Sequence, residues 1–173
     1  MLITIFADAS HCPHTKAAGW GAWAKGDGWK QGVTFGGSLG IRTNNSAEAE
    51  LAAIASAVRT LFNNDSMRKY DAVMIQSDSL RALQVIYHAL DTCHIANHSE
   101  GAPIPYTAQL TLSPAEKKTA DNLVELLRGR MVYVRHVRGH QRGGGRSWVN
   151  RTCDEIARRG MIKQTRKRRK KHS

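Results

Sequence analysis

The chain has 173 residues, of which 41% are hydrophobic and 23% charged, a size and composition typical of one globular domain with a hydrophobic core. No apolar run approaches the ~20 residues that a membrane-spanning helix needs, so we expect no such helix. The formal net charge of +12 predicts a polyanionic partner, most often a nucleic acid.

The first part of the chain predicts three consecutive antiparallel strands. Residues 2–7 (LITIFA) alternate and are rich in β-branched side chains, which favours a strand. Two further apolar runs flank Gly26-Asp27-Gly28, a sequence typical of a hairpin turn. We therefore expect a β-meander at the start of the domain.

The segment TNNSAEAELAAIASAVRTLF predicts a helix. Asn44 or Asn45 can cap its start, because an asparagine side chain accepts hydrogen bonds from the free N–H groups of the first turn. We expect the helix to pack on the sheet, because one of its faces carries Leu51, Ile54, Ala55, Val58 and Leu61.

The second half of the chain alternates between strands and helices. AVMIQSDS predicts a buried strand, residues 80–90 a helix, and residues 91–112 an irregular segment. SPAEKKTADNLVELLRG predicts a helix with a serine N-cap, MVYVRHV a strand, and SWVNRTCDEIARRG a last helix. The order predicts one α/β domain over residues 1–160, with helices flanking a mixed five-stranded sheet of three antiparallel strands followed by two parallel additions.

Residues 161–173 carry seven Lys or Arg residues and no acidic residue. Like charges at this density repel each other and bury little, so we expect a basic, disordered tail. Its expected partner is nucleic acid, and the alternative is a tail that only keeps the protein in solution.

The cysteines are few and odd in number, and the sequence shows no signal peptide. This pattern argues against a disulfide framework and favours a reducing compartment. We therefore expect a cytoplasmic protein, and we expect it to act as a monomer.

Four acidic residues are placed where α/β proteins commonly bind ligands. Asp8 ends the first predicted strand and Asp78 follows the fourth, so both should lie at the carboxyl ends of neighbouring strands. Glu48 lies in the first turns of the first helix and Asp154 in the last helix, and we expect both helices to reach the same edge.

Such a cluster would be tolerable only with bound cations, because four converging carboxylates repel each other. Oxygen ligands select Mg²⁺ or Mn²⁺ over zinc. Two such ions ~4 Å apart would clamp the attacking and leaving oxygens of a phosphodiester.

The sequence motifs resemble those of type 1 ribonuclease H. FADAS resembles the first-strand Asp motif of that family, and TNNSAEAELAAI resembles its Asn-Asn-x-x-Glu helix start. IQSDSLRAL resembles its Ser/Thr-Asp-Ser motif, and VRGHQ followed by NRTCDEIAR resembles its Gly-His loop and Cys-Asp-Glu-Leu-Ala helix. The resemblance covers residues 2–160 and rests on four motifs in the expected order.

The resemblance implies a ribonuclease H-like fold and a specific reaction. The expected enzyme is an endoribonuclease that hydrolyses the RNA strand of RNA/DNA hybrids by a two-metal-ion mechanism, giving 5′-phosphate and 3′-hydroxyl ends. The expected cofactor is Mg²⁺, with two ions bound together with the substrate and Mn²⁺ as a substitute. The implied metal-binding and catalytic carboxylates are Asp8, Glu48, Asp78 and Asp154.

The resemblance also implies roles for other residues. His140 matches a loop histidine that shuttles protons or helps the product leave, and the surrounding glycines suit a loop that opens and closes. Thr43, Asn44 and Asn45 match residues that contact the substrate. We further expect Arg142 and Arg146 to meet phosphate.

Glu50 competes with Glu48 for the place in the cluster, because the two cannot face the metals equally from one helix. The Asn-Asn-x-x-Glu spacing selects Glu48, so we expect Glu50 to face solvent. Residues 91–118 carry only two lysines and no tryptophan, where many bacterial members have a basic, Trp-rich protrusion. We hypothesise that the C-terminal basic residues substitute for that protrusion.

Two other functions compete with this interpretation. A non-catalytic nucleic-acid-binding module would keep the fold and the charge, but the presence of all four carboxylates and His140 argues against it. A DNA-cutting relative, such as a junction resolvase or a transposase core, would share the fold. The Asn-Asn helix start and the pairing of the Gly-His and Cys-Asp-Glu motifs argue against that alternative.

Overall fold

The computed structural model describes the greater part of the chain. The backbone is described for residues 1–92, 97–99, 110–138 and 145–171, and the side chains within these ranges except at 92, 97–99, 145–147, 169 and 171.

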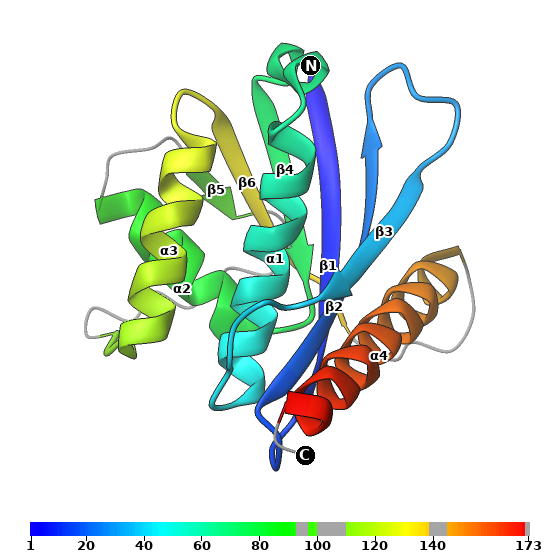
Figure 1. Cartoon of the computed structure of the whole chain (residues 1–173). Helices are drawn as coiled ribbons and strands as arrows, with labels where there is room; N and C mark the ends of the chain where they lie inside the picture. Colours follow the sequence, from blue (N-terminus) through cyan, green and yellow to red (C-terminus); the bar gives the residue numbers. More distant parts are fainter. Residues whose placement is uncertain (93–96, 100–109, 139–144, 172–173) are drawn as a thin grey trace.

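The strands form one mixed sheet in the order β3-β2-β1-β4-β6-β5 (Figure 1). The first three strands pair antiparallel, and β4 and β6 add in parallel, so the predicted five-stranded arrangement is confirmed. A sixth, three-residue strand extends the edge from the segment predicted to be irregular. The strands are β1 (Leu2–Cys12), β2 (Ala17–Gly26), β3 (Val33–Ser38), β4 (Ala72–Ser77), β5 (Asn97–Ser99) and β6 (Met131–His136).

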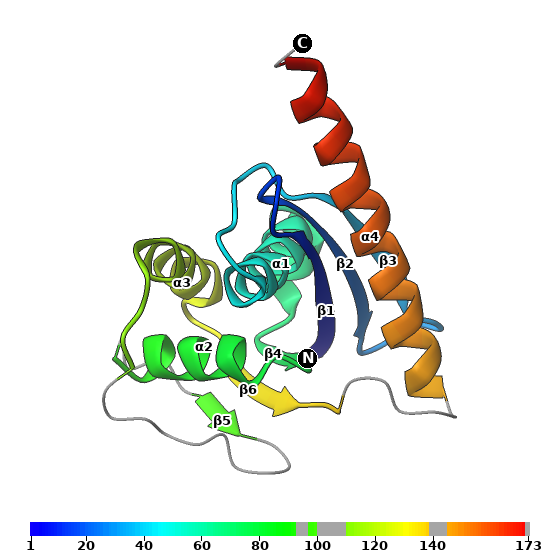
Figure 2. The same ribbon diagram turned by 90° about the horizontal axis from the view of Figure 1, so that it is seen from below.

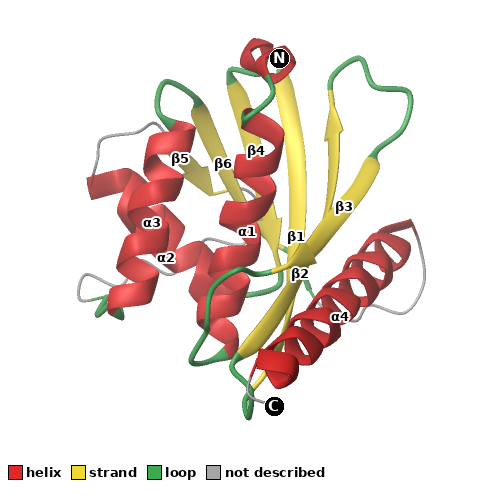
Figure 3. Ribbon diagram, viewed as in Figure 1, coloured by secondary structure: helices red, strands yellow, loops and turns green. Residues whose placement is uncertain are grey.

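The helices form two layers on opposite faces of this sheet (Figures 2 and 3). Three helices, α1, α2 and α3, lie on one side, and α4 lies on the other side against β2 and β3. No described helix is both long and apolar enough to span a membrane. The helices are α1 (Ser46–Phe62), the short 3-10 helix η1 (Asp65–Lys69), α2 (Leu80–Thr92), α3 (Pro114–Leu127) and α4 (Gly145–Lys171).

The main core lies between the sheet and α1. Alternating residues of β1 point toward the helix, where Ile3, Ile5 and Ala7 are buried. The predicted apolar face of α1 is confirmed, since all five of its residues are buried: Leu51, Ile54, Ala55, Val58 and Leu61.

On the opposite face, α4 lies with its backbone almost directly on the strands. A Cβ atom added at Gly21 would lie 2.1 Å from the carbonyl oxygen of Cys153, and one added at Gly160 would lie 2.1 Å from that of Gly37. Residues without side chains on both partners therefore permit this close approach of helix and sheet.

The last helix also corrects the predicted disordered tail. Residues 161–171 continue α4 without interruption, and Gln164 is buried. Cys153, Ala157, Gly160, Gln164 and Arg168 recur every three or four residues, which places them on one face of the helix. That face packs on the sheet and its loops, so tertiary contacts overcome the repulsion of the neighbouring basic side chains.

We predict that Gly160→Ala lowers the free energy of unfolding by about 2 kcal/mol, because the new methyl group would overlap the backbone of β3. In an exposed helix interior the same change stabilises by about 1 kcal/mol. A loss of stability would therefore show that Gly160 is packed against β3. Urea unfolding measures it. Gly40→Ala is the control, because a Cβ atom there meets nothing within 4 Å, and a stabilised Gly160→Ala protein would contradict the described packing.

Candidate active site

Three carboxylates from different elements converge where β1 and β4 part. Asp8 lies in β1 two residues beyond Phe6, the last residue that pairs with β4, and Asp78 directly follows β4. Glu50 reaches them from the second turn of α1. Each of the three residues is partly buried and offers an oxygen that lies within 4.8 Å of the other two.

The electrostatics of this cluster centre on Glu50. Burial, followed by the negative charges of Asp8 and Asp78, raises the pKa of Glu50 to about 9. Its Oε2 atom is buried and has no hydrogen-bond partner among the described residues. The cluster therefore holds more negative charge than its protein surroundings neutralise.

Glu48 does not belong to this cluster, which corrects the predicted set of ligands. Its Oε2 accepts a hydrogen bond from the Asn44 N–H (2.8 Å), and its Oε1 accepts one from Ser113 Oγ (2.9 Å). The prediction that Glu50 faces solvent is likewise wrong.

The start of α1 explains the exchange of these two roles. Asn45 caps the helix and accepts a hydrogen bond from the Glu48 N–H (2.9 Å), so Glu48 is the third helical residue. A glutamate at that position turns back toward the free N–H groups of the first turn. Glu50 lies roughly 200° further round the helix and points toward β1. The Asn-x-x-Glu spacing of a helix cap was the signal in the sequence for this structural role.

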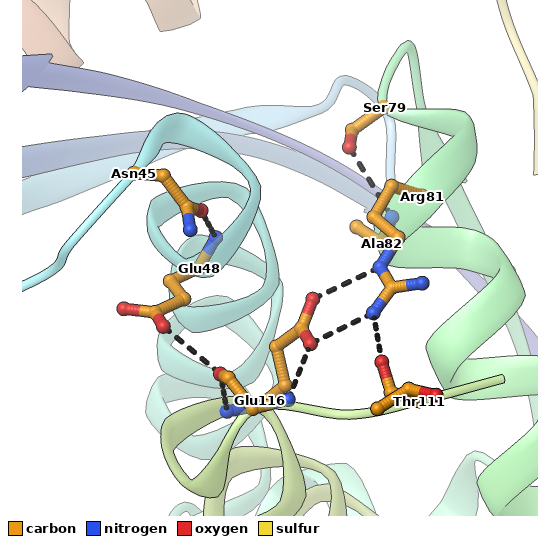
Figure 4. A network of polar contacts seen from close by, with 8 residues as sticks. Asn45, Glu48, Ser79, Arg81, Ala82, Thr111 and Glu116 are labelled. Atoms are coloured by element: carbon orange, nitrogen blue, oxygen red, sulfur yellow. Dashed lines mark hydrogen bonds and ion pairs between the residues drawn. The ribbon is translucent and has the colours of Figure 1, made fainter.

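A polar network joins the N-termini of three helices beside the cluster (Figure 4). Glu48 in α1 contacts Ser113, which is the predicted serine N-cap of α3 and forms a reciprocal pair with Glu116. Glu116 also accepts two hydrogen bonds from Arg81 (3.0 and 2.9 Å), which keep the pKa of Glu116 below its ordinary value. Arg81 lies in the first turn of α2, three residues after Asp78, so the network stabilises the positions of both Asp78 and α1.

Asp154 lies outside the group of three carboxylates, on the part of α4 that packs beside Asp8. It is exposed on α4, directly after Cys153, whose carbonyl oxygen packs on Gly21, the partner of Asp8 in the β1–β2 pairing. Burial, followed by the Asp8 charge, raises the pKa of the Cys153 thiol to about 12. This thiol stays protonated, and Cys153 acts as a small buried side chain in the contact between α4 and the sheet.

The predicted substrate-binding residues have different surroundings. Asn44 and Asn45 are exposed, whereas Thr43 is only 1% exposed and has its hydroxyl group enclosed. His140 and Arg142 lie outside the described residues. Arg146 lies in the first turn of α4, and its side chain is not described.

His136 was not singled out from the sequence, because the nearby VRGHQ motif directed attention to His140. It ends β6, and its Nε2 lies 3.1 Å from the carbonyl oxygen of Asp78. The adjacent Val137 N–H donates to the carbonyl oxygen of Ser77 (3.0 Å). These contacts connect β6 to the backbone that carries Asp78.

Comparisons with known proteins agree with this architecture. The RNase H family model matches residues 2–162. RNase H1 from the halophilic archaeon Halobacterium salinarum NRC-1 is 18% identical, with a TM-score of 0.61 over 94% of this chain and 99% of that chain. The N-terminal RNase H domain of a Mycobacterium tuberculosis protein is 17% identical, with a TM-score of 0.58 over 93% of this chain and 99% of that chain.

A third structure, LC11-RNase H1 in complex with an RNA/DNA hybrid, is 16% identical, with a TM-score of 0.60 over 93% of this chain and 97% of that chain. No curated protein matches the sequence significantly. The structural likenesses show the fold, and the family match extends over nearly the whole chain. The chain therefore belongs to the RNase H family, and this membership supports a nuclease activity.

Proposed function

We propose that this protein is an endoribonuclease that hydrolyses the RNA strand of RNA/DNA hybrids with two divalent metal ions, and that it acts as a monomer in the cytoplasm. The observation that carries the proposal is the carboxylate cluster of Asp8, Glu50 and Asp78. The solved complex of LC11-RNase H1 with an RNA/DNA hybrid supports the choice of substrate. The net charge of +12 supports a polyanionic substrate.

The donor set fits Mg²⁺, with Mn²⁺ as a substitute. All three residues offer carboxylate oxygens, which hard divalent cations prefer, and Glu50 Oε2 has no partner among the described residues. We propose Asp154 as a fourth ligand, because α4 passes beside Asp8. When bound, the ions would lower the pKa of a water molecule and stabilise the leaving 3′-oxygen, so that the products carry 5′-phosphate and 3′-hydroxyl ends.

The other residues of the site would bind the substrate and move protons. Asn44 and Asn45 are exposed beside α1 and would contact the hybrid, where the 2′-hydroxyl distinguishes RNA from DNA. His140 would exchange protons with the reacting groups, because histidine is the side chain that ordinarily changes charge near neutral pH. Arg142 and Arg146 would bind phosphate.

The outward face of α4 would bind the phosphate backbone. Its exposed side chains line a shallow groove around Ile162, and this face carries no acidic side chain after Glu155. Regularly spaced cations on a rigid helix suit a polyanion, and this surface would take the place of the basic protrusion that residues 91–118 lack. The groove is lined by Arg159, Ile162, Lys163, Arg166, Lys167 and Lys170.

The first prediction from the proposed function concerns cleavage of a labelled RNA/DNA hybrid in Mg²⁺. Asp78→Asn and Glu50→Gln should each lower the cleavage rate by about 10²-fold or more, because each removes a charged ligand from the cluster. Glu48→Gln is the matched control and should stay within about tenfold of wild type, because Glu48 acts through structural hydrogen bonds.

The same experiment tests duplex DNA, duplex RNA and single-stranded RNA as alternative substrates. A reaction in EDTA is the control without metal. Hybrid binding without cleavage in Mg²⁺ or Mn²⁺ would favour the non-catalytic binding module. Cleavage of duplex DNA would favour the DNA-cutting relative. A larger loss in Glu48→Gln than in Glu50→Gln would restore the ligand set expected from the Asn-Asn-x-x-Glu spacing.

The second prediction concerns stability without metal. The folded-state pKa of Glu50, about 9, lies above its ordinary value of 4.5, so the folded protein binds the extra proton between these pH values and loses stability as the pH rises. Glu50→Gln removes this dependence and should raise the Tm in EDTA at pH 8 by roughly 5 °C, with little effect at pH 4.

Thermal melts with and without Mg²⁺ check this prediction. Mg²⁺ should raise the Tm of the wild type more than that of Glu50→Gln, because the cation relieves the repulsion that the substitution has already removed. The same pH profile for both proteins would show that Glu50 does not titrate as its surroundings indicate.

The third prediction concerns the outward face of α4. Replacing Lys163, Lys167 and Lys170 with glutamine should weaken hybrid binding and flatten its salt dependence by up to about one slope unit for each lost phosphate contact. Fluorescence anisotropy at several salt concentrations measures both effects. The control replaces three exposed lysines near the start of β1 with glutamine, namely Lys25, Lys30 and Lys69. Equal changes in the two triple variants would show that only total charge matters.

A further inference from the structure

The end of α4 contacts two loops that lie far apart in the sequence. The family match ends at residue 162, whereas the helix continues to Lys171. Gln164 is 8% exposed, and its Oε1 accepts a hydrogen bond from the Ala18 N–H (2.7 Å). Its Nε2 donates to the carbonyl oxygens of Leu39 and Ile41, the latter at 3.4 Å. This one side chain therefore joins the start of β2 to the segment between β3 and α1.

Arg168 makes a second bridge between the same two loops. Its Nη1 donates to the carbonyl oxygen of Thr15 (2.6 Å), and its Nη2 donates to that of Ile41 (3.3 Å). The carbonyl groups of residues 39 and 41 belong to a segment without regular secondary structure, so the helix supplies hydrogen bonds that a sheet would otherwise supply. Both bridges lie on the inward face of α4, away from the lysines of the outward face.

The bridged loops in turn hold the residues proposed to contact the substrate. Thr43 N–H donates to the Lys16 carbonyl oxygen (3.3 Å), and Lys16 Nζ donates to the carbonyl oxygen of Asn44 (3.4 Å). His11 Nε2 lies 3.0 Å from the carbonyl oxygen of Thr43. A continuous set of contacts thus runs from the end of α4 to the backbone of Asn44.

The turn at Lys16 needs such support. Lys16 has a φ of 56°, a left-handed conformation that is costly for a residue with a side chain. Such a conformation persists when the surrounding contacts hold it. Arg168 binds the carbonyl oxygen of the preceding residue, Thr15, and Gln164 binds the N–H of Ala18 on the other side of the turn.

We propose that Gln164 and Arg168 are positioning residues for substrate binding. They hold the Lys16 turn and residues 39–42 so that Asn44 and Asn45 are presented to the RNA/DNA hybrid. The inference rests on the proposed function and gives the inward face of α4 a role that depends on hydrogen-bond geometry and not on charge.

The experiment compares Gln164→Met, Arg168→Met and Arg168→Lys by steady-state cleavage of the hybrid and by hydrogen exchange. Each variant should raise KM about fivefold with kcat within twofold of wild type, because the contact residues lose their fixed position while the carboxylates keep theirs. Amide exchange should accelerate in residues 39–45 and stay unchanged in the buried part of α1.

Arg168→Lys separates geometry from charge. It keeps the positive charge but cannot donate to two carbonyl groups as the guanidinium does, so it should resemble Arg168→Met. The contrasting variant, Lys163→Gln with Lys167→Gln, should flatten the salt dependence of binding without changing exchange in residues 39–45. The three inward variants should keep the salt dependence of the wild type or, for Arg168→Met, lose only the part due to one charge.

Each assay is run at a temperature where circular dichroism shows the variant to be folded. Arg168→Lys is the most conservative variant and decides the matter if Gln164→Met does not fold. If Arg168→Lys has the same KM as the wild type and the same amide exchange in residues 39–45, the inference is overturned while the proposed function stands. Failure of the wild-type protein to bind or cleave the hybrid would instead overturn the proposed function, and the inference with it.

Discussion

The repulsion among Asp8, Glu50 and Asp78 is the interaction on which the rest of this structure depends. Their oxygens lie within 4.8 Å of one another in a partly buried site, and burial with the two aspartates raises the pKa of Glu50 to about 9. The fold holds them together through parallel pairing of β1 with β4 and through the hydrogen bonds that link α1, α2 and α3. A divalent cation would turn this unfavourable arrangement into a binding site.

The sequence predicted those parts of the site that follow from strand order. Asp8 and Asp78 follow apolar, β-branched runs, and parallel neighbours bring their carboxyl ends to one edge whatever the details of packing. The choice between Glu48 and Glu50 depends instead on the residue at which α1 begins. A shift of two residues turns a side chain roughly 200° around the helix, so a motif spacing alone did not decide it.

The C-terminal residues show a different limit of prediction. Charge density in residues 161–173 favours disorder, and that argument considers the segment by itself. The structure adds a surface for it to pack on, where Gly160 meets β3 and Gln164 and Arg168 bind loop carbonyl groups. Their four-residue spacing was visible in the sequence, but its meaning depended on knowing that the sheet and two loops lie opposite.

The length of α4 would let it serve two parts of the proposed site. Its 27 residues span about 40 Å. Within this length, about 22 Å separates Cys153, which packs on Gly21 beside Asp8, from Arg168, which binds the loop that holds Asn44. A continuous helix packed backbone to backbone on β2 and β3 resists bending, so its two ends keep a fixed separation. Metal ligation at one end and substrate contact at the other would then share one rigid element. The inward face sets that geometry, which leaves the outward face free to carry the charge that a polyanionic substrate requires.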